Sequence, residues 1–390
     1  MKSWIEISRA ALAANVNAIR ALVGPEIAIM GVIKSDAYGH HIEAAAQTLV
    51  GAGIGWIGIA DVDEARRVRE AVGLEPHIFV MVGPQPADAP TIVAARLTAC
   101  VWTPEQVFAL EEAAGLQQRR VSVHLELETG MGRQGAAPGE ELRRVLRALA
   151  ASKWIDFDGI MTHLAESEVH GSPLTAQQLQ RFDAALAQLH EDSPDRTLPR
   201  WIHIGNSSSM DEGSTLAWVR DRAQRLGARA MVRPGYALYG HCLPVREPAT
   251  GEPAKALLEP QLQPVMTWKT HILSLREAAL GSGVGYGATF VCERPTRVAL
   301  LPIGYADGFR RAASSGVGNG WVMLHGQRAL ILGRVSMNLT MVDVTDIPHA
   351  TVGDEVTLLG KGVSAEDHAR WAQTIGYEIF CGIRARVVVR

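Results

Sequence analysis

The feature that most constrains the fold of this chain is a repeated alternation of short apolar runs and helical stretches over its first 232 residues. Apolar runs of this length indicate buried strands, and helices between successive strands favour parallel pairing. The eight runs are Ile27–Ile33, Trp56–Ala60, Ile78–Val82, Thr98–Val101, Val121–Glu126, Phe157–Met161, Trp201–Ile204 and Ala230–Val232. Helical stretches lie between most of them, namely Ile42–Val50, Asp63–Val72, Pro104–Ala113, Glu140–Ala151 and Ala176–Leu189. Eight strands separated by helices predict a closed parallel α/β barrel, in which functional side chains gather at the carboxyl ends of the strands. A doubly wound open sheet is the alternative that this pattern leaves open.

The chain changes character on both sides of the alternation. Trp4–Ile7 predicts a strand, and Ser8 predicts the N-cap of the helix that follows. Arg246–Pro260 is rich in Pro, Glu and Ala, which is typical of a linker. Strand-like runs with turn residues follow it at Val265–Leu275, Arg297–Pro302, Trp321–Leu324, Arg328–Val335, Thr340–Val344 and Glu355–Leu359, with one helical stretch at Ala365–Ile375. We therefore expect a (β/α)8 TIM-type barrel over residues 1–246, with residues 3–8 as candidates to pair with the second domain, and a C-terminal mostly-β domain over residues 258–390.

Composition and charge exclude several classes of protein. Hydrophobic residues make up 47% of the chain and charged residues 20%, with a net charge of -3, so neither nucleic acid nor an anionic membrane is expected as a partner. The four cysteines are far apart, which argues against a zinc site or a disulfide framework. The N-terminus lacks the apolar core of a signal peptide, and no run of about 18 apolar residues is present that could span a membrane. A cytoplasmic protein is expected.

Lys34 is the first candidate for chemistry, because it ends the first apolar run of the predicted barrel and is one of only six lysines. Burial at such a position lowers the pKa of a lysine and frees its amine to attack an aldehyde. A salt-bridged lysine at the barrel mouth is the alternative. The polar side chains of Asp36, Tyr38 and His40 follow directly and favour a cofactor site.

The loops after the last two predicted barrel strands are candidates for binding a phosphate. His203–Ser207 follows the seventh strand, and Arg233–Tyr236 follows the eighth. Phosphate sites in such barrels are frequently built from these two loops. The Ser207 hydroxyl and the backbone N–H groups of Gly235 and Tyr236 suit that role. Each short sequence taken alone is more often an ordinary turn. Together with Lys34, they indicate pyridoxal phosphate, which needs a lysine, phosphate donors and a partner for its pyridine nitrogen.

Eight blocks of sequence, in order, resemble the alanine racemase family over nearly the whole chain. They are residues 32–40, 128–133, 162–163, 206–207, 232–235 with 238–240, 284–287, 302–308 and 333–337. The resemblance implies a pyridoxal-phosphate barrel with a C-terminal β domain, working as a head-to-tail homodimer. It also implies an enzyme that interconverts L-alanine and D-alanine, supplying D-alanine for cell-wall peptidoglycan.

Racemisation requires two acid–base groups, because the α-proton leaves one face of the substrate and returns on the other. Lys34 serves one face, and the resemblance assigns the other to Tyr286 from the partner subunit. A free tyrosine has a pKa of about 10, so it needs nearby positive charge or hydrogen-bond donors to act as a base near neutral pH. His163 and Arg233 are the candidates for that network.

The resemblance assigns further roles around the cofactor. Arg233 faces the pyridine nitrogen, and since a guanidinium cannot accept a proton there, proton exchange is favoured over transamination and decarboxylation. Arg133 contacts the phenolic oxygen and the substrate carboxylate. Glu126 stands where many relatives have a carbamylated lysine, so we expect it to supply the charge that orients Arg133. The remaining cofactor-binding candidates are Tyr38, His163, Asn206, Ser207, Gly235 and Tyr236, and the substrate-binding candidates are Arg133, Met337 and Tyr305.

Two departures from the family pattern concern specificity. Asn338 follows Ser336 and Met337 where the family commonly has Cys-Met-Asp, and Ala385 stands where many relatives have a phosphate-binding tyrosine. Loss of a phenol and a charge at the substrate entrance widens it. A broad-specificity amino-acid racemase is therefore the alternative function.

Other classes fit the sequence less well. A decarboxylase of the same architecture is disfavoured by Arg233, and a metal-dependent hydrolase using His40, His41 and His163 lacks further ligands at metal spacing. We expect no metal. A non-catalytic pyridoxal-phosphate carrier would resemble the barrel alone. The glycines of Gly51–Gly55 have the wrong spacing for a nicotinamide-binding loop.

Overall fold

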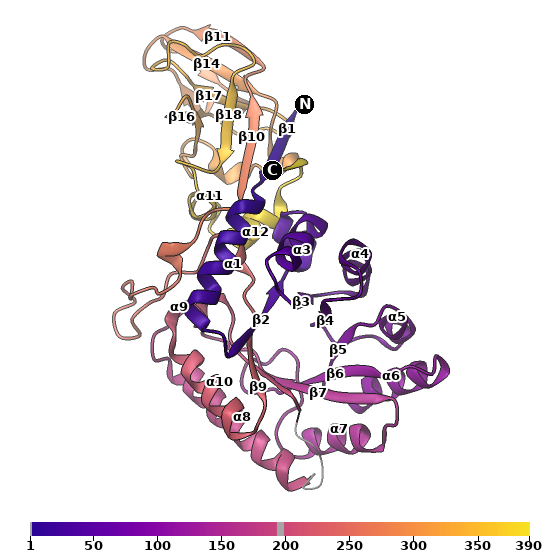
Figure 1. Ribbon diagram of the computed structural model, residues 1–390. Coiled ribbons are helices and arrows are strands. Elements are labelled where there is room, and N and C mark those ends of the chain that lie inside the picture. Colours follow the sequence, from indigo (N-terminus) through magenta and orange to yellow (C-terminus); the bar gives the residue numbers. More distant parts are fainter. Residues whose placement is uncertain (1, 193–198) are drawn as a thin grey trace. The chain divides into compact units, whose positions relative to one another are not determined.

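The computed structural model describes residues 2–192 and 199–390, which form two compact units (Figure 1). The barrel unit comprises residues 11–37 and 42–263, and the sheet unit comprises residues up to 10, 38–41 and 264–390.

The barrel unit is built on a closed barrel of parallel strands, in which each strand pairs with its neighbours along the chain. The strands are β2 (Ile27–Val32), β3 (Trp56–Ile59), β4 (His77–Val80), β5 (Thr98–Val101), β6 (Val121–Glu126), β7 (Ile155–Met161), β8 (Trp201–His203) and β9 (Arg229–Val232). The barrel closes where β9 pairs with β2, from Ile27↔Ala230 to Ile29↔Val232. This closure confirms the predicted barrel and excludes the open sheet.

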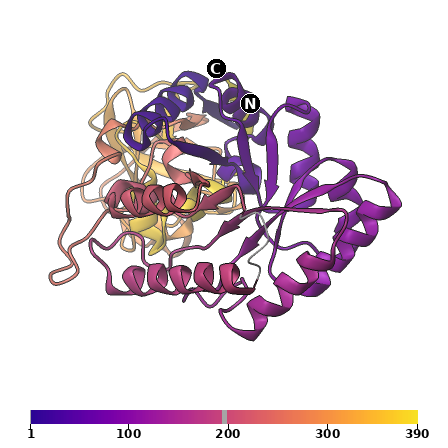
Figure 2. The same cartoon turned by 60° about the horizontal axis from the view of Figure 1, so that its bottom comes forward.

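Helices surround the barrel strands, as Figure 2 shows from a second direction. They are α1 (Arg9–Val23), α3 (Ile42–Gly51), α4 (Val62–Val72), α5 (Ala89–Ala94), α6 (Pro104–Leu116), α7 (Glu140–Ala151), α8 (Pro173–Asp192), α9 (Ser207–Glu212) and α10 (Ser214–Arg225). Local sequence explains where they begin. In α6, Thr103 and Gln106 form a capping box with Pro104 at the first helical position.

Side chains from many of the strands fill the barrel and make it a packed core. The buried cluster consists of Met30, Trp56, Phe79, Cys100, Met161, Trp201 and Met231. Because this cluster is apolar, the polar side chains near the strand ends stand out as candidates for function.

The sheet unit contains a nine-stranded sheet, as far as the described residues show, in the order β11-β14-β17-β16-β15-β18-β10-β1-β19. Its strands are β1 (Ser3–Ile7), β10 (Met266–His271), β11 (Ser274–Ala278), β14 (Thr296–Leu301), β15 (Trp321–Leu324), β16 (Gln327–Leu332), β17 (Thr340–Asp343), β18 (Glu355–Leu359) and β19 (Arg386–Val389). β1 pairs antiparallel with β10 and parallel with β19, so both ends of the chain lie in one sheet. A separate hairpin joins β12 (Gly283–Val284) to β13 (Phe290–Val291).

The sheet unit differs from the sequence expectation in detail. The run expected at Val265–Leu275 is divided into β10 and β11, and β19 had not been anticipated. The helix expected over Ala365–Ile375 ends early. α11 (Ala365–Ala372) stops because Gln373 adopts a left-handed conformation with φ of 53°, and α12 (Gly376–Gly382) then begins.

The expected linker at Arg246–Pro260 is anchored to the barrel unit at its far end. The buried carboxylate of Asp211, in α9, accepts hydrogen bonds from the backbone N–H groups of Leu258 at 2.6 Å and Glu259 at 3.1 Å. Within the described ranges, no helix combines the length and the apolar character needed to cross a bilayer.

The side chain of Asn15 in α1 generates a test of the barrel unit's packing. It is fully buried, donates to the carbonyl oxygens of Leu238 and Gln263 and accepts from the Gln263 N–H. We expect Asn15→Ala to lower the free energy of unfolding by about 2–4 kcal/mol, since each buried group left unsatisfied costs about 1–3 kcal/mol. Urea unfolding measures this loss. Asn17→Ala, at an exposed position of the same helix, is the control, and equal midpoints for the two variants would contradict the prediction.

Candidate active site

Polar side chains gather at one mouth of the barrel unit because they follow the carboxyl ends of its parallel strands. These residues are Lys34 after β2, Glu126 at the end of β6, His163 after β7, His203 at the end of β8 and Arg233 after β9. Two backbone hydrogen bonds connect these segments. The Val32 N–H, at the end of β2, donates to the Pro234 carbonyl at 2.8 Å, and the Arg233 N–H donates to the Gly205 carbonyl at 2.9 Å. The fold thus brings distant parts of the sequence to one place.

Arg233 is buried at this mouth, with 3% of its surface exposed. Its Nη1 donates to the His203 carbonyl at 2.8 Å, and its Nη2 donates to the Thr162 carbonyl at 2.8 Å. Burial lowers the pKa of Arg233 to about 10, so the guanidinium remains charged at neutral pH. Its Nε, although buried, has no hydrogen-bond partner among the described residues. A buried donor without a partner is costly, and this one is available to an acceptor on a ligand.

His163 lies beside Arg233, with its Nδ1 3.3 Å from Nη2 of the guanidinium. The pKa of His163 is lowered to about 3, first by burial and then by the positive charges of three neighbours. These neighbours are Arg233, Arg133 and Lys34. His163 is therefore neutral at physiological pH, and four of the predicted site residues are close enough to interact electrostatically.

A pair of buried histidines extends from Arg233 into the barrel. His203 Nδ1 lies 3.3 Å from Arg233 Nη1, and His203 Nε2 lies 2.8 Å from His124 Nδ1. Arginine can only donate, so His203 Nδ1 accepts and its Nε2 carries the proton. His124 Nδ1 then accepts in turn.

Asp158 completes this polar chain. The remaining proton of His124, on Nε2, faces the Asp158 carboxylate at 3.9 Å, and Arg200 holds that carboxylate at 2.5 Å. Burial lowers the pKa of both His124 and His203, which keeps the two rings neutral. No role was predicted for His124 or Asp158 from the sequence. Polar side chains at inward positions of otherwise apolar strands were the signal that could have revealed them.

Glu126 is buried, with 2% of its surface exposed, and burial raises its pKa. Its carboxylate accepts hydrogen bonds from Gln134 Nε2 and from the Cys100 thiol, the latter at 3.3 Å. Arg133 interacts with Glu126 electrostatically, but no ion pair within 4.0 Å joins the two in the described part of the chain. Gln134 and Cys100 are thus neighbours that the sequence did not reveal, and the expected orientation of Arg133 by Glu126 stays a prediction.

The loops after β8 and β9 meet at Ser207. Asn206 caps α9 through its side-chain oxygen, and its side-chain amide donates to the hydroxyl of Ser167, in the segment after β7, at 2.8 Å. The Ser207 hydroxyl accepts the backbone N–H groups of Gly235 at 3.2 Å and Ala237 at 3.0 Å. The predicted phosphate-binding residues of the barrel unit are therefore neighbours.

Other predicted residues lie in the sheet unit. Tyr38 is buried and packs against Tyr377 with 5.8 Å between ring centroids, and burial raises its pKa. Tyr286 and Met337 are 69% and 56% exposed and border one hollow of about 690 Å³. Asn338 lines the same hollow.

Tyr305 and Ala385 complete the set of predicted residues. Tyr305 is 43% exposed, and its N–H donates to the Ser336 carbonyl at 3.1 Å, next to Met337. Ala385 stands directly before β19 and is not among the lining residues of the hollow. The structure thus brings Tyr305, Met337 and Asn338 near each other. The N–H of Arg384, directly before Ala385, donates to the carbonyl of Asp307, two residues after Tyr305, at 3.0 Å.

Comparisons with known proteins show which family the chain belongs to. The family model "Alanine racemase, N-terminal domain" matches residues 7–242, and "Alanine racemase, C-terminal domain" matches residues 265–390. The chain belongs to the alanine racemase family. A curated alanine racemase from Halothermothrix orenii is 36% identical, with 99% of this chain and 95% of that protein covered.

Solved structures give the same result for the fold. The alanine racemase of Clostridium difficile 630 has a TM-score of 0.87 at 28% identity. The match covers 100% of this chain and 96% of that chain. The alanine racemase of Bartonella henselae, solved with covalently bound pyridoxal phosphate, has a TM-score of 0.82 at 24% identity, with 100% of each chain covered. Because the identity to the Bartonella henselae protein is only 24%, this similarity shows only that the two chains share a fold.

The lowered pKa of His163 predicts a pH dependence of stability. The unfolded residue titrates near about 6.5, so the unfolded state binds more protons than the folded state between that pH and about 3. The free energy of unfolding should therefore fall as the pH drops below about 6.5. We expect His163→Gln to reduce the loss between pH 7 and pH 5 by about 1–2 kcal/mol. Denaturant titrations at both pH values measure it, with exposed His190→Gln as the control. An unchanged loss in His163→Gln would contradict the argument.

Proposed function

We propose that this protein interconverts L-alanine and D-alanine, using pyridoxal phosphate attached to Lys34. When bound, the cofactor supplies an electron sink that makes the α-proton of an amino acid acidic. The observation that carries the proposal is the buried guanidinium of Arg233, whose Nε lacks a partner among the described residues. It stands at the barrel mouth where Lys34 follows the first strand.

Arg233 fits the pyridine nitrogen of this cofactor. That nitrogen is a hydrogen-bond acceptor, and the Nε–H is a buried donor in need of one. Although burial lowers the pKa of Arg233, its value of about 10 is high enough that the arginine keeps its proton at neutral pH. Arg233 would therefore leave the ring nitrogen of the bound cofactor unprotonated, which would favour simple proton exchange over decarboxylation.

The phosphate would be held by the loops after β8 and β9. The Ser207 oxygen accepts the N–H groups of Gly235 and Ala237, so its hydroxyl proton can be donated to a phosphate oxygen. Asn206 orders the start of α9. We assign Tyr236 and, by the family resemblance, Tyr38 to the same task.

Two residues would move the proton. The amine of Lys34 removes or returns it on one face, and the phenol of Tyr286 from a second copy of the chain acts on the other. Exposure of Tyr286 and Met337 beside one hollow supports a homodimer, because large exposed apolar side chains favour coverage by a partner. In the dimer, the Met337 N–H binds the substrate carboxylate, with Tyr305 beside it.

Arg133 would bind the substrate carboxylate from the barrel side. We propose that Glu126 replaces a carbamylated lysine and supplies the nearby negative charge. Although burial raises its pKa, the hydrogen bonds from Gln134 and Cys100 favour the charged form. The negative charge of Glu126 would act on Arg133 by electrostatic attraction, without direct contact.

A complementation experiment tests both the activity and the shared site. We expect Lys34→Ala to lose borohydride-stable attachment of the cofactor and Tyr286→Phe to retain it, with racemisation of L-alanine low in both. Random exchange of subunits makes half the dimers mixed, and each mixed dimer has one intact site of two. Mixing the variants should therefore restore about a quarter of the wild-type activity. Attachment that survives in Lys34→Ala would refute the assignment of the lysine, and no recovery on mixing would refute the shared site.

A broad-specificity amino-acid racemase is the second candidate, and Asn338 favours it. This exposed residue lines the hollow that contains Tyr286, where the family commonly has an aspartate. Ala385 adds a second small side chain in place of a phenol. A neutral, wider entrance admits larger or cationic substrates.

Substrate preference distinguishes the two candidates. We expect Asn338→Asp combined with Ala385→Tyr to lower kcat/KM for serine and lysine relative to alanine by about 10- to 100-fold, because each added pocket contact is worth about 1–3 kcal/mol. Racemisation assays on a panel of L-amino acids measure the ratio, with Asn319→Asp as a charge-matched control away from the hollow. A wild-type enzyme that already rejects serine, lysine and arginine a thousandfold would exclude the broad-specificity reading.

A further inference from the structure

The segment that begins with Lys34 has a backbone conformation that most residues avoid. Ser35, Asp36, Ala37 and Tyr38 have φ values of 56°, 52°, 57° and 56°, and Gly39 has 78°. L-amino acids adopt the left-handed helical region at an energetic cost, and usually only as single residues. A run of this length persists only where the surroundings hold it in place. The Ala37 N–H donates to the Ile33 carbonyl at 2.9 Å, which closes the left-handed turn upon itself.

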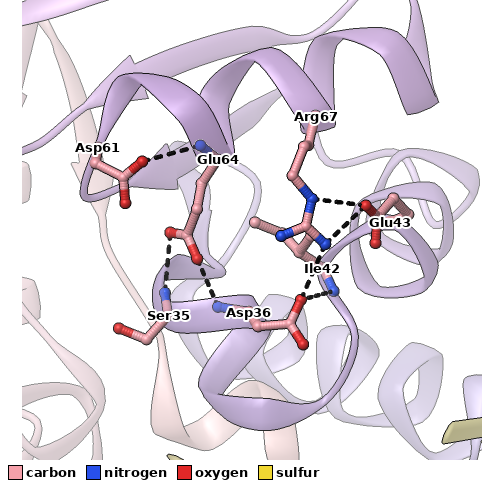
Figure 3. Close-up of polar contacts among 7 residues, drawn as sticks. All are labelled: Ser35, Asp36, Ile42, Glu43, Asp61, Glu64 and Arg67. Atoms are coloured by element: carbon pink, nitrogen blue, oxygen red, sulfur yellow. Dashed lines mark hydrogen bonds and ion pairs between the residues drawn. The ribbon is translucent and has the colours of Figure 1, made fainter.

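A single carboxylate binds the start of this turn (Figure 3). Glu64 Oε2 accepts the Ser35 N–H at 3.0 Å, and Glu64 Oε1 accepts the Asp36 N–H at 2.6 Å. Successive N–H groups in such a turn form a concave group of donors that suits an anion. Both oxygens of Glu64 are therefore used at the two residues that follow Lys34.

Helix α4 fixes the position of Glu64. Asp61 caps the helix and accepts the Glu64 N–H at 2.9 Å, so the carboxylate extends from a defined first turn. One helical turn further, Arg67 lies 3.3 Å from Asp36 and 2.8 Å from Glu43. Both of these ion pairs involve the half-exposed Arg67 and are weakened by solvent, so we assign the main restraint to Glu64.

The contacts of Glu64 act directly on the backbone of Lys34. The Ser35 N–H belongs to the peptide group that joins Lys34 to Ser35, so its direction sets ψ of Lys34 and φ of Ser35. The Asp36 N–H does the same for the next peptide group. With both groups held, the direction in which the lysine side chain leaves the backbone is restricted.

We propose that Glu64 is a positioning residue, which holds the left-handed turn after Lys34 and so directs the lysine amine toward its reaction partners. The assignment rests on the proposed function only for the reaction that the Lys34 amine carries out. The geometry of the turn is a property of the chain itself. Glu64 does not touch the substrate, and it acts through the backbone.

Glu64→Gln tests the proposal, because an amide keeps the size of the side chain but places an NH2 group against one of the two donors. We expect faster hydrogen exchange at the amides of Ser35 and Asp36 in the cofactor-free protein. In the loaded enzyme, we expect kcat for L-alanine to fall about 10- to 100-fold with a smaller change in KM, since a small misplacement of a reacting group costs rate more than binding. The visible absorption of the attached cofactor should shift as well.

Asp63→Asn is the matched control, because it removes the same charge from the first turn of the same helix and its side chain is 92% exposed. We expect wild-type exchange, kcat and absorption for it. Unchanged exchange and kcat in a folded Glu64→Gln would overturn the proposal. If Glu64→Gln does not fold, Glu64→Asp decides in its place, since the shorter carboxylate cannot reach both N–H groups and should show the same losses.

Failure of the proposed function has a different signature. It would appear as a wild-type protein without cofactor attachment or racemisation. In that case, the exchange rates of Ser35 and Asp36 in the cofactor-free variants still report whether Glu64 holds the turn.

Discussion

Closure of the barrel between its first and last strands is the constraint on which the rest of the candidate site depends. β2 and β9 pair up to Ile29↔Val232, and the Val32 N–H then donates to the Pro234 carbonyl at 2.8 Å. These contacts join the strand that leads to Lys34 to the strand that leads to Arg233. In an open sheet, strands so far apart in sequence need not be neighbours, and the amine and the guanidinium would have no reason to share a site. Closure also makes all parallel strands end at one mouth, which explains how residues from across the barrel unit converge.

Desolvation at this mouth sets the charges. Arg233 keeps its charge because the nearby carboxylate of Glu126 partly offsets the effect of burial on its pKa, whereas burial leaves the two neighbouring histidines, His163 and His203, neutral. The mouth is therefore positive, and it suits a ligand with a phosphate and a carboxylate. Burial also raises the pKa of Glu126 and so disfavours the charged form of its carboxyl group. A buried carboxyl can replace a carbamate only if donors stabilise its charged form, and Gln134 and Cys100 are the donors that make this replacement physically reasonable.

The strand pattern predicted the barrel, because buried parallel strands are short apolar runs separated by helices. Lys34 and Arg233 could be predicted for a related reason, since polar residues directly after apolar strands stand out. The buried side chains that contact the other site residues could not be predicted. His124 pairs with His203 across 79 positions of sequence, and Gln134 reaches Glu126 from a loop with no periodicity. Such contacts depend on the rotation of each strand and on side-chain direction, which hydrophobic periodicity does not encode. β19 was missed because a short strand that joins the edge of a sheet has no alternation long enough to detect.

The left-handed turn shows the same limit most clearly. Of the five residues with positive φ that follow Lys34, only Gly39 is a glycine, so the sequence contains no local signal for this conformation. Propensity alone would favour a right-handed turn, and the observed backbone must be imposed by contacts from elsewhere. Helix α4 supplies them through Glu64, a residue that looks like an ordinary first-turn acid of an amphipathic helix. Strain of this kind is tolerated where it holds a functional group, and here it begins at the one lysine that follows a barrel strand. The unusual backbone that follows Lys34 therefore supports its proposed role independently of any sequence motif.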